Sequence, residues 1–176
     1  MNREGQWEVD AMSEDRRTDG PMPTESVWDY PRPPRVEPDG RRVVIAHRGV
    51  VLADSRACRR VLETSHPPVF YVPPHDVRTD LLSKSQGSTF CERKGLATYW
   101  NLAVDGCTVP DAAWSYEAPS PEYGSIAGHL AFYAGRVDLC TVGGERVLAQ
   151  PGDFYGGWIT AEIIGPYKGA SGTAGW

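Results

Sequence analysis

The clearest hydrophobic pattern in the chain is an alternation of period two that follows Gly87. One face of this segment is expected to carry Leu96, Thr98, Trp100, Leu102 and Val104. Such alternation is typical of a half-buried β-strand. Asp105-Gly106, a dipeptide that favours a tight hairpin turn, comes next, so residues 108–116 are expected to return as the antiparallel partner.

Shorter apolar runs separated by turn residues predict further strands on both sides of this hairpin. The expected strands cover residues 43–46, 50–52, 69–72, 129–133 and 137–142. Arg48-Gly49 is the expected turn between the first two, and Ala134-Gly135 the expected turn of a hairpin between the last two.

Two segments predict short helices instead of strands. Apolar residues four positions apart predict one helix that Asp54 or Ser55 caps and Glu63 ends, and residues 76–82 could form one or two further turns. Two short helices and about seven strands predict a mainly β fold. The expected form is a compact antiparallel sheet, tent-like or barrel-like.

The composition divides the 176 residues into unequal parts around one domain. Residues 1–25 are acidic and poor in branched apolar residues, which predicts a disordered leader. Residues 26–40 predict a proline-rich extended arm, residues 41–151 the β-rich core domain, and residues 152–176 a glycine- and aromatic-rich tail packed on the core.

Charge and motif content exclude several classes of function. Residues 1–40 hold ten of the 23 acidic side chains and five of the 18 basic ones, so the body is neutral and nucleic acid is not an expected partner. No apolar run suits a membrane span or secretory signal, which predicts a cytoplasmic protein without a membrane partner. The scattered cysteines and histidines predict free thiols and no metal site. The sequence has no cofactor-binding motif, so no cofactor is expected.

The segment Thr-Phe-Cys-Glu-Arg-Lys-Gly, residues 89–95, is the first place where we expect a site. Arg93 and Lys94 favour the reactive thiolate of Cys91. In a strand, however, Cys91 and Lys94 point to opposite faces unless Gly95 bends the chain. Lys94 is one of only three lysines against fifteen arginines, which favours a role as acid, base or nucleophile. The alternatives are a small buried thiol and solvated charges.

Carboxylates and aromatic residues complete the candidate set. Glu63 and Asp76 are expected proton partners of Lys94, or simple helix-end residues exposed to water. For Lys168 exposure to solvent is the simpler interpretation. Aromatic residues on adjacent strands would wall a pocket, or alternatively pack in the core. The expected substrate-binding residues are Arg48, Tyr71, Thr89, Tyr99, Trp114 and Tyr116.

These residues favour a metal-independent enzyme that acts on a small molecule. Lys94 would be the acid, base or anion-holding group, Cys91 a nucleophile or pocket thiol, and Glu63 or Asp76 the proton partner. Two alternatives stay open. The same pocket could bind a metabolite without catalysis, or the arm and tail could assemble the chain as a homo-oligomer.

Several motifs also carry a resemblance to a known family. They are Glu25-Ser26-Val27-Trp28-Asp29-Tyr30-Pro31, the segment from Val61 to Pro68, Tyr71-Val72-Pro73-Pro74, Asp76-Val77, the segment from Thr89 to Gly95, Ala113-Trp114-Ser115-Tyr116, Ile126-Ala127-Gly128-His129 and Ala131-Phe132-Tyr133. Together they resemble a bacterial family, domain of unknown function four-two-seven, and the leader and the tail from Gly156 to Trp176 resemble its actinobacterial members. The resemblance implies a β-rich tent fold over residues 25–176 and no established activity. The family is sometimes labelled nucleotidyltransferase-like, but the chain has no phosphate-binding loop.

Overall fold

The computed structural model describes residues 23–176, so the predicted acidic leader lies almost wholly outside the described residues. The strands are β1 (Glu25–Ser26), β2 (Arg35–Asp39), β3 (Val43–His47), β4 (Val50–Ser55), β5 (Cys58–Leu62), β6 (Val69–Tyr71), β7 (Leu82–Cys91), β8 (Gly95–Val104), β9 (Cys107–Tyr116), β10 (Ala131–Phe132), β11 (Leu139–Val142), β12 (Glu145–Arg146), β13 (Leu148–Ala149), β14 (Trp158–Ile159) and β15 (Ile163–Ile164). The 3-10 helices are η2 (Val27–Asp29), η3 (Pro74–Asp76), η4 (Thr79–Leu81), η5 (Pro121–Ile126) and η6 (Ala134–Arg136). The predicted mainly β fold is confirmed.

The longest strands form one antiparallel sheet in the order β10-β9-β8-β7. Asp105 and Gly106 both have positive φ, at 51° and 74°, as the predicted tight turn between β8 and β9 requires. The predicted alternation along β8 is confirmed toward its end, where Leu102 and Val104 are buried and Ala103 is exposed.

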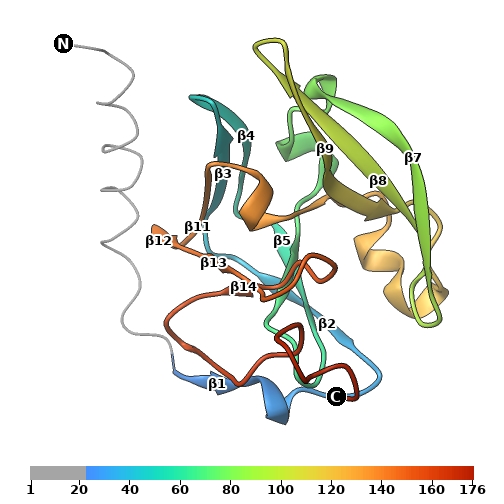
Figure 1. Ribbon diagram of the computed structural model, residues 1–176, viewed down its shortest axis with the longest axis vertical. Coiled ribbons are helices and arrows are strands. Elements are labelled where there is room, and N and C mark those ends of the chain that lie inside the picture. Colours follow the sequence, from blue (N-terminus) through green and yellow to red (C-terminus); the bar gives the residue numbers. More distant parts are fainter. Residues whose placement is uncertain (1–22) are drawn as a thin grey trace.

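Two further sheets complete the body. One has the order β12-β11-β3-β4, with the predicted hairpin turn at Arg48 and Gly49, and the other has the order β2-β5-β6. In Figure 1 the β7–β9 sheet and the β3–β4 hairpin lie on opposite sides of the molecule, with β5 between them. The largest cluster of buried apolar side chains in the described residues fills the space between these sheets, and none of the sheets in residues 23–176 closes into a barrel.

The helix predicted to end at Glu63 is wrong, because residues 58–62 form strand β5. This strand lies between β2 and β6, and four of its five residues are buried. A strand covered on both faces loses its period of two, so apolar residues four positions apart do not separate it from a helix. The turns predicted over residues 76–82 are present only as η3, which ends at Asp76, and η4.

The hairpin predicted from residues 129–133 and 137–142 is also wrong. β10 pairs with β9, whereas β11 pairs with β3 and β12. The intervening η6 sends the chain from one sheet to the other. Both strands were predicted approximately, but their partners were not, because pairing with earlier strands depends on long-range packing.

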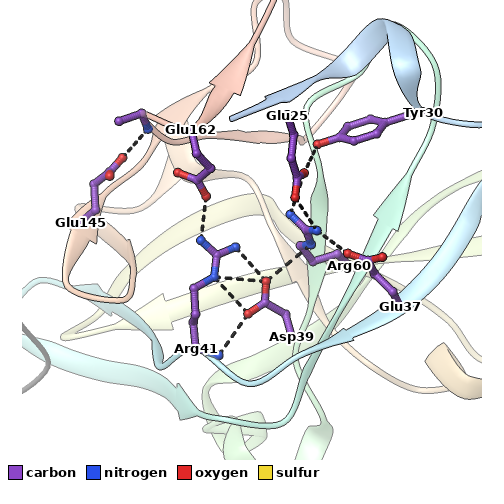
Figure 2. A network of polar contacts seen from close by, with 9 residues as sticks. Glu25, Tyr30, Glu37, Asp39, Arg41, Arg60, Glu145 and Glu162 are labelled. Atoms are coloured by element: carbon purple, nitrogen blue, oxygen red, sulfur yellow. Dashed lines mark hydrogen bonds and ion pairs between the residues drawn. The ribbon is translucent and has the colours of Figure 1, made fainter. Parts of the chain in front are cut away.

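A polar network joins β1, β2, β5 and the segment before β15 (Figure 2). Its first centre is Arg60 of β5, which is only 5% exposed. The Arg60 guanidinium donates two hydrogen bonds of 3.1 Å to Glu25 and another to Glu37. The hydroxyl of Tyr30 donates to Glu25 at 2.5 Å. Charge-assisted bonds of this kind are about twice as strong as neutral ones.

The second centre of the network is Arg41, which follows β2. It donates to Asp39 through Nη2 at 2.7 Å and to Glu162 through Nη1 at 2.6 Å. Asp39 also lies 3.4 Å from Nε of Arg60, so the two centres share a carboxylate. Since β1 pairs in parallel with β15, the network fixes segments from both ends of the described chain against β2 and β5.

The network shifts the ionisation of its carboxyl groups. Burial alone would raise the pKa values of Glu25, Asp39 and Glu162, but hydrogen bonds to the arginines and other donors outweigh burial and lower them. Carboxyl groups whose pKa is lower in the folded protein than in the unfolded chain stabilise the fold at pH values above their pKa in the unfolded chain. This stabilisation is lost as the pH falls through their pKa in the folded protein.

We therefore expect the thermal midpoint to fall steeply below about pH 4, the ordinary carboxyl range. Arg60→Met should lower the free energy of unfolding at pH 7 by about 3 kcal/mol, because it leaves carboxylates without their buried partner. The difference from wild type should shrink as the pH falls and those carboxylates become protonated. Circular dichroism melts between pH 7 and pH 3 measure both effects.

The matched control is Arg78→Met, which removes an exposed pair with Asp80 and should leave the midpoint unchanged. Equal midpoints for wild type and Arg60→Met at pH 7 would contradict a stabilising role of the network.

Candidate functional site

A cavity of about 290 Å³ opens between the end of β5, the β7–β9 sheet and the segment that follows residue 149. Most of the predicted site residues meet there. Those that line the cavity are Glu63, Tyr71, Thr89, Cys91, Lys94, Tyr99, Trp114 and Tyr116. Strand pairing explains part of this convergence, because Tyr99 lies opposite Trp114 across β8 and β9.

Arg48 and Asp76 do not line this cavity. Arg48 occupies the β3–β4 turn, where its backbone N–H donates to Asp138 at 2.7 Å. Asp76 ends η3 and accepts a 2.6 Å hydrogen bond from the buried Ser55 hydroxyl. The substrate-binding role predicted for Arg48 and the proton-transfer role predicted for Asp76 therefore lack the placement they need.

Lys94 and Cys91 converge because the chain bends at Gly95, as strand geometry requires for the two side chains to meet. Gly95 has a φ of 103°, a conformation that suits glycine, and Cys91 pairs with it across the β7–β8 turn. Lys94 lies inside that turn rather than in a strand, and the Ser120 N–H donates to its carbonyl at 3.3 Å. Both side chains therefore reach the cavity.

Lys94 is a buried cation without a carboxylate partner among the residues that the structure describes. It is 9% exposed, and its Nζ lies 5.8 Å from the centre of the Tyr116 ring, a cation–π distance. The ion pairs among residues 23–176 are formed by arginine and histidine side chains, and none of them includes Lys94. The Lys94 ammonium is thus available to a ligand.

Aromatic side chains form the wall beside this cation. Trp114 packs on Tyr133 with ring centres 4.6 Å apart, and its Nε1–H donates to the Tyr71 hydroxyl at 3.3 Å. Burial raises the pKa values of Tyr71, Tyr116 and Tyr133. Their hydroxyls therefore keep their protons at neutral pH and act as hydrogen-bond donors. The Tyr99 and Thr89 hydroxyls bond each other at 2.9 Å.

The most informative residues that sequence reasoning missed are His66 and Gln150. The Gln150 amide nitrogen lies 3.0 Å from His66 Nδ1 and donates to the Lys168 carbonyl at 2.8 Å. The Gln150 oxygen accepts from the Gly157 N–H at 3.0 Å, which fixes the orientation of the amide. His66 Nδ1 must then be the acceptor, so neutral His66 carries its proton on Nε2.

Electrostatics support this neutral histidine. Burial lowers the pKa of His66, and the nearby Lys168 and Lys94 lower it further against the opposing effect of Glu63. No sequence spacing marks the contact, because 84 positions separate His66 from Gln150. The available signals were the runs Gly156-Gly157 and Tyr167-Lys168-Gly169, which here place the tail against the site.

The tail supplies Phe154, Tyr155, Gly156 and Lys168 to the cavity wall. Lys168 is not simply solvated, because its Nζ donates to the backbone oxygen of Trp176 at 2.9 Å and lies 5.5 Å from the Tyr155 ring centre. Gly156 lies directly against Trp114, and a Cβ added there would overlap the indole ring. Only glycine permits this close approach of the backbone.

The described residues show neither a metal cluster nor a membrane helix. Within residues 23–176, no group of three or more histidine, cysteine, aspartate or glutamate side chains could hold a metal ion. No helix in that range is long and apolar enough to cross a membrane. All four cysteines are free. Cys58 and Cys140 are buried, and burial raises their pKa values, to about 12 for Cys58, whereas Cys107 is exposed.

Gly156→Ala is expected to push the tail away from Trp114 and to lower the free energy of unfolding by about 1–3 kcal/mol, the usual cost of overpacking. Near-ultraviolet circular dichroism and chemical denaturation measure the two effects. Gly175→Ala is the control, because a Cβ there meets nothing within 4 Å. A Gly156→Ala protein as stable as wild type would contradict the close packing of the tail.

Comparison with known proteins gives one family. The model of the family described as domain of unknown function DUF427 matches residues 35–143, which confirms the resemblance seen in the motifs. No curated protein matches the chain. The matched segment includes Lys94 and His66, whereas Gln150 and Lys168 lie beyond it. Because the match spans more than half of the 176 residues, the chain belongs to the DUF427 family.

Proposed function

We propose that this protein binds a small molecule in the cavity around Lys94. The observation that carries the proposal is a lysine that is 9% exposed, has no carboxylate partner among the described residues, and lines a cavity of about 290 Å³. An uncompensated buried charge destabilises a fold, so its presence beside a cavity supports a role in binding or chemistry. A small ligand with a negative group would supply the missing partner.

We further propose that the bound molecule is a substrate. Lys94 is the acid, base or anion-holding group, and Glu63, the only carboxylate among residues 23–176 that lines the cavity, is the proton partner. Cys91 lines the same cavity and is a pocket thiol or nucleophile. In this scheme side chains of the chain itself exchange protons with the substrate, and no metal takes part.

Binding without catalysis is the second candidate, and the hydrogen bonds within the wall favour it. Trp114 bonds Tyr71, Tyr99 bonds Thr89, and the Tyr133 hydroxyl donates to the Phe154 carbonyl at 3.0 Å. Polar groups that are already paired hold a pocket rigid and leave fewer atoms for proton transfer. A ligand that is bound but recovered unchanged would favour this candidate.

Thermal shift against a metabolite library tests the proposed binding. A ligand of the cavity should raise the midpoint of wild type and of Lys84→Ala, whose lysine is exposed on β7. The same ligand should stabilise Lys94→Ala much less. Equal stabilisation of all three proteins would remove Lys94 from the site.

The stabilising ligands from that screen then separate the two candidates. Mass spectrometry after incubation should show conversion by wild type and a loss of about 100-fold or more in rate for Glu63→Gln, since general acid–base catalysis typically contributes that much. Conversion at an unchanged rate by Glu63→Gln would contradict the proton-transfer role. An unaltered ligand would establish binding alone.

Cysteine alkylation gives an independent test within one molecule. A bound ligand should slow the reaction of iodoacetamide with Cys91, which lines the cavity, and leave the exposed Cys107 unaffected. Peptide mass spectrometry resolves the two sites. Equal protection of both cysteines, or of neither, by a ligand that stabilises wild type would place that ligand outside the cavity.

A further inference from the structure

We infer that the ligand is an aromatic carboxylic acid, bound as its monoanion with the carboxylate at Lys94 and the ring between the aromatic walls. This inference rests on the proposed function and names the chemical class of its ligand. Three features of the cavity carry it: the hydrogen-bonding character of its polar groups, its net charge, and the nature of its walls.

The polar groups that remain available around Lys94 are mostly donors. The Lys94 ammonium offers N–H donors, and the Tyr116 hydroxyl keeps its proton because burial raises its pKa. No group in residues 23–176 forms a hydrogen bond with the Tyr116 hydroxyl. The Nε2–H of His66 is also without a partner in that range, because the contact with Gln150 uses only Nδ1. Donors without partners in a cavity select a ligand group that accepts hydrogen bonds, as a carboxylate does.

The net charge of the cavity distinguishes a carboxylate from a phosphate. The charged side chains that line it are Lys94, Lys168 and Glu63, which sum to one positive charge with His66 neutral. A monoanion balances that charge. A phosphate monoester carries about −1.5 to −2 at neutral pH and would leave a negative excess in a half-enclosed site. Lys168 is moreover already bonded to the backbone oxygen of Trp176, so Lys94 is the cation that a carboxylate reaches.

The walls favour a flat ring over an aliphatic chain. Tyr71, Trp114, Tyr116 and Tyr133 lie within one buried cluster, so a planar ligand has aromatic faces and edges to pack on. Phe90 and Phe154 also line the cavity although they are 73% and 60% exposed. Large aromatic side chains left in water beside a cavity become covered when a ring binds between them.

Three compounds with one ring system and different head groups test the inference by titration calorimetry on the full chain: 2-naphthoate, 2-naphthamide and 2-naphthyl phosphate. We expect 2-naphthoate to bind at least about tenfold more tightly than either of the others. Lys94→Met should lower the affinity for 2-naphthoate at least about tenfold and change that for 2-naphthamide little. Lys84→Met, on the exposed face of β7, is the matched control and should bind 2-naphthoate like wild type.

Results that differ from these expectations each refute a specific part of the inference. Equal affinity for the amide refutes recognition of the negative charge, and tighter binding of the phosphate refutes the carboxylate class. If 2-naphthoate fails to bind while another class of library compound stabilises wild type but not Lys94→Ala, the inference is wrong and the proposed binding function stands. If Lys94→Met does not fold, Lys94→Arg replaces it and should keep the preference for 2-naphthoate over 2-naphthamide.

Discussion

Arg60 and the carboxylates around it hold together the parts of the chain that build the cavity (Figure 2). Arg60 lies on β5, and the residues after this strand carry Glu63 and His66 to the cavity. Arg41 bonds Glu162, next to β15, and the residues that follow carry Lys168 to the cavity, where its backbone N–H donates to the Ser65 carbonyl at 2.8 Å. The network therefore joins two segments of the cavity lining that come from distant parts of the sequence.

Buried ion pairs of this kind are costly when one partner is removed, because the remaining charge is left in a medium of low dielectric constant. Both arginines of the network, the buried Arg60 and the half-buried Arg41, meet at least one carboxylate, and the pKa values of Glu25, Asp39 and Glu162 fall accordingly. The same physical rule makes Lys94 unusual. The residue is almost as buried, but no carboxylate of residues 23–176 pairs with its ammonium, which lies 5.8 Å from the centre of the Tyr116 ring.

Local chemistry made part of the structure predictable from sequence. Period-two alternation and Asp105-Gly106 were sufficient for the β8–β9 hairpin, because turn and strand preferences act over neighbouring residues. The sequence predicts a helix where β5 forms, because a strand buried on both faces lacks the period of two. In the site, the aromatic wall and Lys94 could be found from residue type, whereas His66 and Gln150, 84 positions apart, meet only in the folded chain. Arg48 and Asp76 were proposed without any constraint on their distance from Lys94.

Gln150 and the tail supply part of the cavity lining from outside the family-matched segment. Gln150 fixes the tautomer of His66, and its side chain lies beyond the match, which ends at residue 143. Gly156 allows the tail to lie against Trp114, so one wall of the cavity depends on a residue without a side chain. A relative could keep Lys94 and Tyr116 yet present a differently shaped or oppositely polar wall. Under the proposed binding function, ligand specificity is therefore expected to vary with the tail, while the position of the cation stays with the β7–β8 turn.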